Sequence, residues 1–127
     1  MWLGYSGHHV AVVLVTRPSL IANRKAELLS FLKAANERIK LLKAGDAEAI
    51  AAAAGKIGIK PEELREQLTG ITLFDIEENK MSSFNSENPN NAIESFELVA
   101  KAAYDFKMVP QPIDVKTLYD DSLVKSL

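Results

Sequence analysis

The chain of 127 residues contains no cysteine, so disulfide bonds and thiolate metal sites are excluded. It has two histidines, the adjacent His8 and His9. Neighbouring residues of a strand point to opposite faces, so we do not expect these imidazoles to hold one metal ion together. A structural or solvent-facing pair is the ordinary interpretation, and we predict neither a metal site nor a cofactor.

Signatures of catalysis are missing as well. The six glycines match neither GxGxxG nor the phosphate-binding GxxxxGK loop, which excludes those two modes of nucleotide binding. No GxSxG nucleophile elbow occurs. Pairs of adjacent carboxylates occur at Glu62/Glu63, Glu77/Glu78 and Asp120/Asp121. Each pair lies in a polar loop or in the first turn of an expected helix, where solvated carboxylates are usual. We therefore predict no catalytic residue and no enzyme.

Long apolar runs and an excess of one charge are also lacking. Residues 10–15, an apolar run near the start, are too few to span a membrane or to form most export signals. Residues 1–60 hold 9 basic and 4 acidic residues, and residues 61–127 hold 6 and 13, so the halves carry +5 and -7. A basic half balanced by an acidic half does not favour nucleic acid as a partner.

The composition is that of a folded domain. Apolar residues make up 47% and charged residues 25%, so we expect one domain over residues 1–127. Gly45 and Gly58 are placed for turns that end helices, Asp46 for an N-cap, and Asp114 for the cap of a last helical segment. Helical spacing predicts the longer helices over residues 22–43, 47–55, 61–68 and 91–106.

Two of these helices carry apolar stripes. The stripes comprise Leu28, Leu32, Ala35, Ile39 and Leu42 in the first helix, and Ala92, Phe96, Val99, Ala103 and Phe106 in the helix over 91–106. We expect them to build the core, with Leu28, Leu32, Ile39, Phe96 and Val99 at its centre. Glu97 and Lys101 are spaced for an ion pair on the outer face of the second of these helices.

Candidate binding residues are few and unspecific. Lys33 and Lys40 could attract an anionic partner, but with Glu37 between them they form what we expect to be a solvated face. Stacking on a ligand is possible for the aromatic side chains Trp2, Tyr5 and Phe84, although core or interface packing is their commoner role.

The segment HVAVVLVT, residues 9–16, is β-branched and apolar on both faces, which predicts a strand buried within a sheet. A second strand is expected at Ile71–Phe74, and residues 75–91 are expected to form a long polar connection. Two strands alone make a poor sheet. The expected class is therefore α/β and helix-rich, with about five helices and one or two short strands.

The order of segments carries a resemblance. A strand leads through TRPSL to LLSFLKAANERIKLL, followed by DAEAIAAAAGKIGIKPEELREQL, an asparagine-bearing loop and a DVKTLYDD tail. This order resembles the C-terminal part of ABC transporter substrate-binding proteins of the nitrate, sulfonate and taurine class, which is related to thiamine pyrimidine-precursor synthases. The resemblance runs from Val10 to about Tyr119 and spans less than half of a complete family member.

The resemblance implies a C-terminal fragment of a periplasmic-binding-protein-like fold. It implies binding of a small organic anion or related nutrient without catalysis, an ABC permease as partner, and a periplasmic or lipid-anchored extracellular location. It assigns no ligand-binding residue to this chain. Because a cleft needs both walls, we expect weak ligand binding or none without the first lobe.

Two other hypotheses remain open. One is a standalone helical interaction or sensor module with a specific protein partner, and the other is an enzyme resembling the pyrimidine synthases that uses His8 or His9. An apolar strand without a sheet tends to pair with another chain. We therefore expect a homo-oligomer through the 9–16 strand, including by strand exchange.

Overall fold

The computed structural model describes residues 13–88 and 91–127, and every regular element in this part of the chain is helical. The elements are α1 (Pro18–Asn23), α2 (Lys25–Lys43), α3 (Ala47–Ile57), α4 (Pro61–Leu68), α5 (Ile76–Glu78), η1 (Asn79–Ser83), α6 (Ala92–Asp105), η2 (Val115–Thr117) and α7 (Ser122–Lys125). Among the short elements, η1 is a π-helical turn that continues α5, and η2 is a turn of 3-10 helix.

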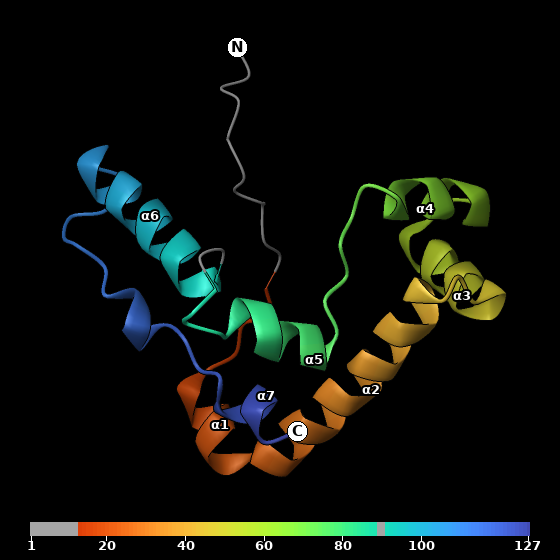
Figure 1. Ribbon diagram of the computed structural model, residues 1–127, viewed down its shortest axis with the longest axis horizontal. Coiled ribbons are helices and arrows are strands. Elements are labelled where there is room, and N and C mark those ends of the chain that lie inside the picture. Colours follow the sequence, from red (N-terminus) through yellow and green to blue (C-terminus); the bar gives the residue numbers. More distant parts are fainter. Residues whose placement is uncertain (1–12, 89–90) are drawn as a thin grey trace.

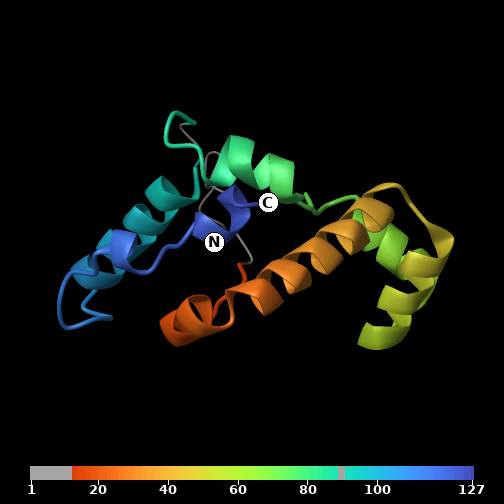
Figure 2. The same cartoon turned by 90° about the horizontal axis from the view of Figure 1, so that it is seen from below.

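The helices form an open arrangement with two ends (Figure 1). At one end α3 packs on α4 and contacts α2, and at the other end α6 packs on η2 (Figures 1 and 2). Between these ends α7 contacts both α2 and η1, and η1 also contacts α6. The elements near the C-terminus therefore connect the long α2 helix to the part of the chain that carries α6.

The expected α/β class is wrong for the described residues, which contain no strand while 65% of the structure is helical. Val13–Thr16 and Ile71–Phe74, both predicted as strands, are irregular, and the remainder of the first strand, residues 9–12, lies outside the described residues. A strand needs a hydrogen-bonded neighbour, and neither segment has one among the described residues. The periplasmic-binding-protein-like architecture that depended on such a sheet is therefore corrected, and residues 13–88 and 91–127 form helices and irregular segments only.

The tightest packing lies where α3 meets α4. Ile50, Ala54 and Leu64 are buried there, and the half-buried side chains around them are Leu42, Ala53, Ile59 and Leu68. Ile50 is only 1% exposed. The small side chains of α3 allow this close approach, and the residue that fills the interface is its one large apolar side chain before the last turn.

A second, smaller packed region joins the C-terminal segments to η1. Val115 and Leu123 are buried in it, and the Phe84 and Tyr119 rings lie with their centroids 5.2 Å apart at 54°. This tilted geometry is favourable for aromatic pairs. The amide of Asn91 is also buried in this half of the molecule, where it accepts a hydrogen bond from the Glu94 N–H at 3.0 Å and caps α6.

The predicted helix ends near α3 are confirmed. Gly45 and Gly58 have φ of 74° and 78°, the left-handed conformation that glycine adopts without a steric cost. Asp46 Oδ1 accepts a hydrogen bond from the Ala49 N–H at 2.8 Å, as an N-cap does. Local turn chemistry therefore fixes both ends of α3.

Two boundaries differ from prediction. The helix expected over 22–43 is divided at Arg24, whose φ of -131° and ψ of 35° are not helical, so Pro18 starts a separate helix. The connection expected over 75–91 begins with helical turns, because Asp75 and Glu78 form a capping box that starts α5.

Candidate protein-binding surface

The apolar stripe predicted for α6 is only partly covered. Ala92, Phe96 and Ala103 are half-buried, whereas Val99 is 67% and Phe106 79% exposed. The placement of Val99 in the core was therefore wrong, because the elements that contact α6 lie against its other sides. The apolar stripe of α2 is covered to a greater extent. Its members Leu28, Leu32, Ala35, Ile39 and Leu42 are all half-buried, although no residue of α2 is fully buried.

One side of α6 is both apolar and exposed. We call it the α6 open face and define it by Leu98, Val99, Ala102 and Phe106. Leu98, Ala102 and Phe106 follow each other at intervals of four residues, which places them in one row along the helix, with Val99 beside them. Leu98 is 52% exposed, and Met108 beyond the helix end is exposed as well.

The segment that returns from the end of α6 lies along another side of the helix. A concavity of about 190 Å³ separates them, lined by Glu97, Ala100, Lys101, Tyr104, Pro112 and Ile113. Since this returning segment and the open face use different rows of α6, the helix is held to the rest of the molecule while its open face stays accessible.

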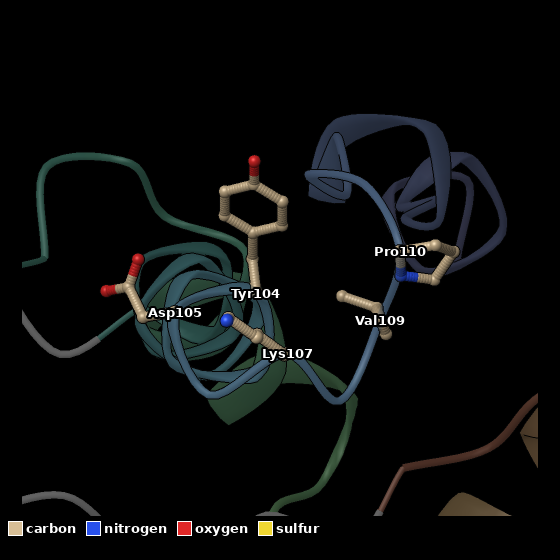
Figure 3. Close-up of a pocket in the computed structure, with 5 residues that line it drawn as sticks. All are labelled: Tyr104, Asp105, Lys107, Val109 and Pro110. Carbon is tan, nitrogen blue, oxygen red and sulfur yellow. The ribbon is translucent and has the colours of Figure 1, made fainter.

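A wider concavity of about 530 Å³ lies at the end of α6 (Figure 3). Tyr104, Asp105, Lys107, Val109 and Pro110 line it. Figure 3 shows Asp105 on the side of the helix away from Val109 and Pro110, with the Tyr104 ring pointing outward. The charged groups therefore do not converge on a common point, as they would in a site for a small ion or a polar ligand.

The end of α6 is set by a strained residue. Lys107 has a φ of 57°, while the Met108 N–H donates to the Ala103 carbonyl at 2.8 Å and the Lys107 N–H donates to the Tyr104 carbonyl at 2.9 Å. This is the Schellman pattern of hydrogen bonds. Its left-handed position is usually occupied by glycine, and here lysine occupies it.

A cluster of charged groups ties α5 to α2. Lys43 Nζ lies 2.5 Å from Glu78 Oε2 and 3.4 Å from Asp75 Oδ2, and Asn36 Oδ1 accepts a hydrogen bond from the Ile76 N–H at 2.8 Å. The hydrogen bond from Lys43 lowers the pKa of Glu78, and the Glu78 backbone N–H lowers the pKa of Asp75. These carboxylates are engaged in structure and are not poised as proton donors.

Tyr119 is the described group with the largest pKa shift. Burial and the negative charge of Asp121 raise the pKa of its phenol to about 12. The hydroxyl is buried and has no hydrogen-bond partner of normal geometry among the described residues. A phenol with so high a pKa is a poor acid or base near neutral pH, so Tyr119 acts in packing.

The other candidates from the sequence are dispersed. His8, His9, Trp2 and Tyr5 lie outside the described residues. The exposed set comprises Lys33, Glu37 and Lys40 on α2, Glu62 and Glu63 on α4, and Glu77 on α5. Asp120 accepts from the Ser122 N–H, Asp121 pairs with Lys125, and Phe84 packs on Tyr119. Lys101, expected to pair with Glu97, lies 2.5 Å from Asp105.

Two further kinds of site are absent from the described residues. Within residues 13–88 and 91–127, no three histidine, aspartate or glutamate side chains are grouped so that they could hold a metal ion. No helix in this part is long and apolar enough to cross a membrane. The α6 open face is therefore the feature of the described structure that most needs a functional explanation.

Comparison with protein-family models, curated proteins and solved structures finds no match to this chain. The function is therefore inferred from the geometry of the described residues.

Proposed function

We propose that this chain is a helical protein-interaction module that binds another polypeptide through the α6 open face. The observation that carries the proposal is the exposure of Leu98, Val99 and Phe106, between 52% and 79%, on a helix that is otherwise anchored. Large contiguous apolar patches on soluble proteins usually mark interaction sites.

The chemistry of the surface supports a polypeptide as the ligand. The open face is convex and carries apolar side chains, and a helix of this kind binds an apolar groove or a second helix through residues spaced by three and four. The concavity beside it has no converging polar groups. A small polar ligand would find few donors or acceptors there, while a protein partner would remove the exposed rings and methyl groups from water.

Site-specific photo-crosslinking in the source cells tests the proposal. A benzoylphenylalanine residue is introduced at Val99 in one variant and at Glu66, an exposed polar position of α4, in a matched control. We expect a protein adduct of defined mass from position 99 and none from position 66. Absence of an adduct from position 99, and from Phe106 in a second variant, would overturn the proposal.

The solute-binding function stays a prediction. In the described residues, two open concavities lie along α6 and the segment that follows it, and no periplasmic-binding-protein-like sheet is present. Equilibrium dialysis of the purified chain against nitrate, taurine and a pyrimidine tests it, and saturable binding would favour transport over the interaction module. The ABC permease, the periplasmic or lipid-anchored location, and pairing through residues 9–16 likewise stay predictions.

A further inference from the structure

We infer that the connection between α4 and α5, residues 69–74, is a processing site at which an endoprotease cuts the chain into two pieces that stay assembled. The first piece ends with α4, and the second begins with α5. Such a cut leaves the α6 open face intact and is independent of the proposed function. Three observations support it: the uncovered backbone of the connection, the contacts that hold its two ends, and the opposite charges of the two pieces.

The connection presents backbone groups that are free to pair. The N–H groups of Thr72, Leu73 and Phe74 donate no hydrogen bond to the described residues, while Ile71 and Phe74 are 55% and 37% exposed. Figure 1 shows the connection as an elongated trace between the two helices. Proteases hold their substrates as an extended strand, through backbone N–H and carbonyl groups. The large apolar side chains of this segment lie beside the bonds to be cut.

Other connections in the described part of the chain are less suited to a protease. Backbone hydrogen bonds close the turns that follow α2, α3 and η1. Residues 109–113 donate no such bond, but Pro110 and Pro112 lie among them, and proline has a fixed φ and no N–H. The short connection before α7 is held by Tyr119, whose ring packs on Phe84. The connection between α4 and α5 has neither kind of protection.

Both ends of the connection are held by contacts that do not involve it. Leu68, in the last turn of α4, is half-buried and packs on the core that α3 and α4 share. Asp75, at the start of α5, lies with its Oδ2 3.4 Å from Lys43 Nζ on α2. α7 of the second piece also contacts α2, and its Leu123 is buried. A cut between these ends therefore leaves both pieces in place on α2.

The two pieces carry charges of opposite sign. Residues 1–68 hold 10 basic and 7 acidic side chains, which gives +3, and residues 75–127 hold 5 and 10, which gives -5. The connection itself holds no charged side chain. The uneven charge of the sequence therefore divides at the proposed cut.

The structure brings opposite charges of the two pieces together along α2. Near its end, Lys43 Nζ lies 2.5 Å from Glu78 Oε2. Near its start, the positive charge of Lys25 acts on Asp120, whose pKa is lowered chiefly by hydrogen bonds from Ser122 and further by this lysine. Opposite charges that face each other favour the association of the pieces.

The covalent step is the hydrolysis of one peptide bond. Water adds across the C–N bond that precedes Ile71, Leu73 or Phe74. A carboxylate forms at the end of the first piece and an amine at the start of the second. The protease acts as the catalyst, and water is the one other reactant.

Limited digestion of the purified full chain with thermolysin tests the site, because this protease cuts before large apolar side chains. Mass spectrometry is expected to place the first cut within residues 17–127 before Ile71, Leu73 or Phe74. The cut chain should elute as one species in size-exclusion chromatography, with the helical circular dichroism of the intact chain. A first cut elsewhere in residues 17–127 would overturn the site, and separate elution of the two pieces would overturn their assembly.

The cut chain also tests the role of the charges. The dissociation constant of the two pieces should rise about three- to tenfold in Lys43→Gln and less than about twofold in Lys33→Gln. Lys33 is a matched control because it is an exposed lysine of the same helix and forms no ion pair with the described residues. Circular dichroism of the uncut variants shows whether each is folded. Equal constants for the two variants, or for the wild type in about 0.05 M and about 0.5 M salt, would contradict assembly through opposite charges.

Discussion

Lys43 Nζ lies 2.5 Å from Glu78 Oε2, an ion pair that joins the last turn of α2 to α5 across 35 positions of the sequence. Asp75, which starts α5, lies 3.4 Å from the same ammonium group, and Asn36 accepts the Ile76 N–H. These contacts hold α5 and η1 against α2, and η1 in turn contacts α6. The position of the open face in the molecule therefore depends on this polar cluster.

Removing one charge of the cluster should destabilise the fold in a pH-dependent way. The folded-state pKa values of Glu78 and Asp75 lie below their ordinary values of 4.5 and 3.8, the first chiefly through the hydrogen bond from Lys43 and the second chiefly through the Glu78 N–H. Stability from these carboxylates is present above the ordinary values and is lost as the pH falls through the folded values. Urea midpoints of Glu78→Gln should be below wild type at neutral pH and approach it in acid.

The matched control for this prediction is Glu66→Gln, a change at an exposed carboxylate of α4 that forms no ion pair with the described residues. Its midpoint should stay close to that of the wild type at both pH values. Equal midpoints for Glu78→Gln and Glu66→Gln at neutral pH would show that the cluster does not hold α5.

The left-handed lysine at the end of α6 gives a prediction of opposite sign. Lys107→Gly should raise the free energy of unfolding by about 1 kcal/mol, because glycine adopts a φ of 57° without a steric cost. Lys56→Gly, in the last turn of α3, should lower it by up to about 1 kcal/mol because that position is helical. Urea denaturation followed by circular dichroism measures both, and a loss of stability in Lys107→Gly would contradict the strain.

The core at α3 and α4 can be tested with two isoleucines of one helix. Ile50→Ala should cost roughly 2–4 kcal/mol, since Ile50 is 1% exposed and its removal leaves a cavity. Ile57→Ala should cost less than about 0.5 kcal/mol, because Ile57 is 61% exposed. Similar losses in the two variants, measured by urea denaturation, would mean that α3 is not packed as described.

The phenol of Tyr119 should titrate well above its ordinary pKa of 10, and the fold should tolerate removal of its hydroxyl. The difference in phenolate absorbance between wild type and Tyr119→Phe should appear at about pH 12 and not near the ordinary value of 10. Because the folded pKa is raised, stability should fall as the pH rises from 10 to 12. Tyr119→Phe should raise the free energy of unfolding by up to about 1 kcal/mol, and a large loss would reveal a partner for the hydroxyl.

The sequence predicted the helices well where local chemistry decides them. The glycines at 45 and 58, Asp46 and Asn91 act at helix ends through contacts within a few residues, which can be inferred without knowing the fold. The capping box of Asp75 and Glu78 has the same local origin, but its spacing of three residues was overlooked and residues 75–91 were predicted as a polar connection.

The sequence predicted poorly whatever depends on distant neighbours. The β-branched residues of the segment ending at Thr16 favour a strand, but a strand also needs a partner, and none lies beside Val13–Thr16 in the described chain. The apolar stripe of α6 predicts an apolar face but does not specify which element covers it. Val99 was therefore predicted to lie in the core, whereas it is exposed. The exposure of the α6 open face depends on which elements pack against α6, and the sequence pattern does not specify them.

The measurement that tests the role of the α6 open face most directly is the mass of this 127-residue chain, expressed in its source cells and recovered in a gentle extract, compared between wild type, Val99→Glu and the control Ile57→Glu. Both substitutions place a charge on an exposed side chain of a helix, and only the first lies on the α6 open face. We predict a species heavier than 14.0 kDa for wild type and Ile57→Glu, and one of 14.0 kDa for Val99→Glu. A wild-type chain that elutes at 14.0 kDa would contradict binding through this face.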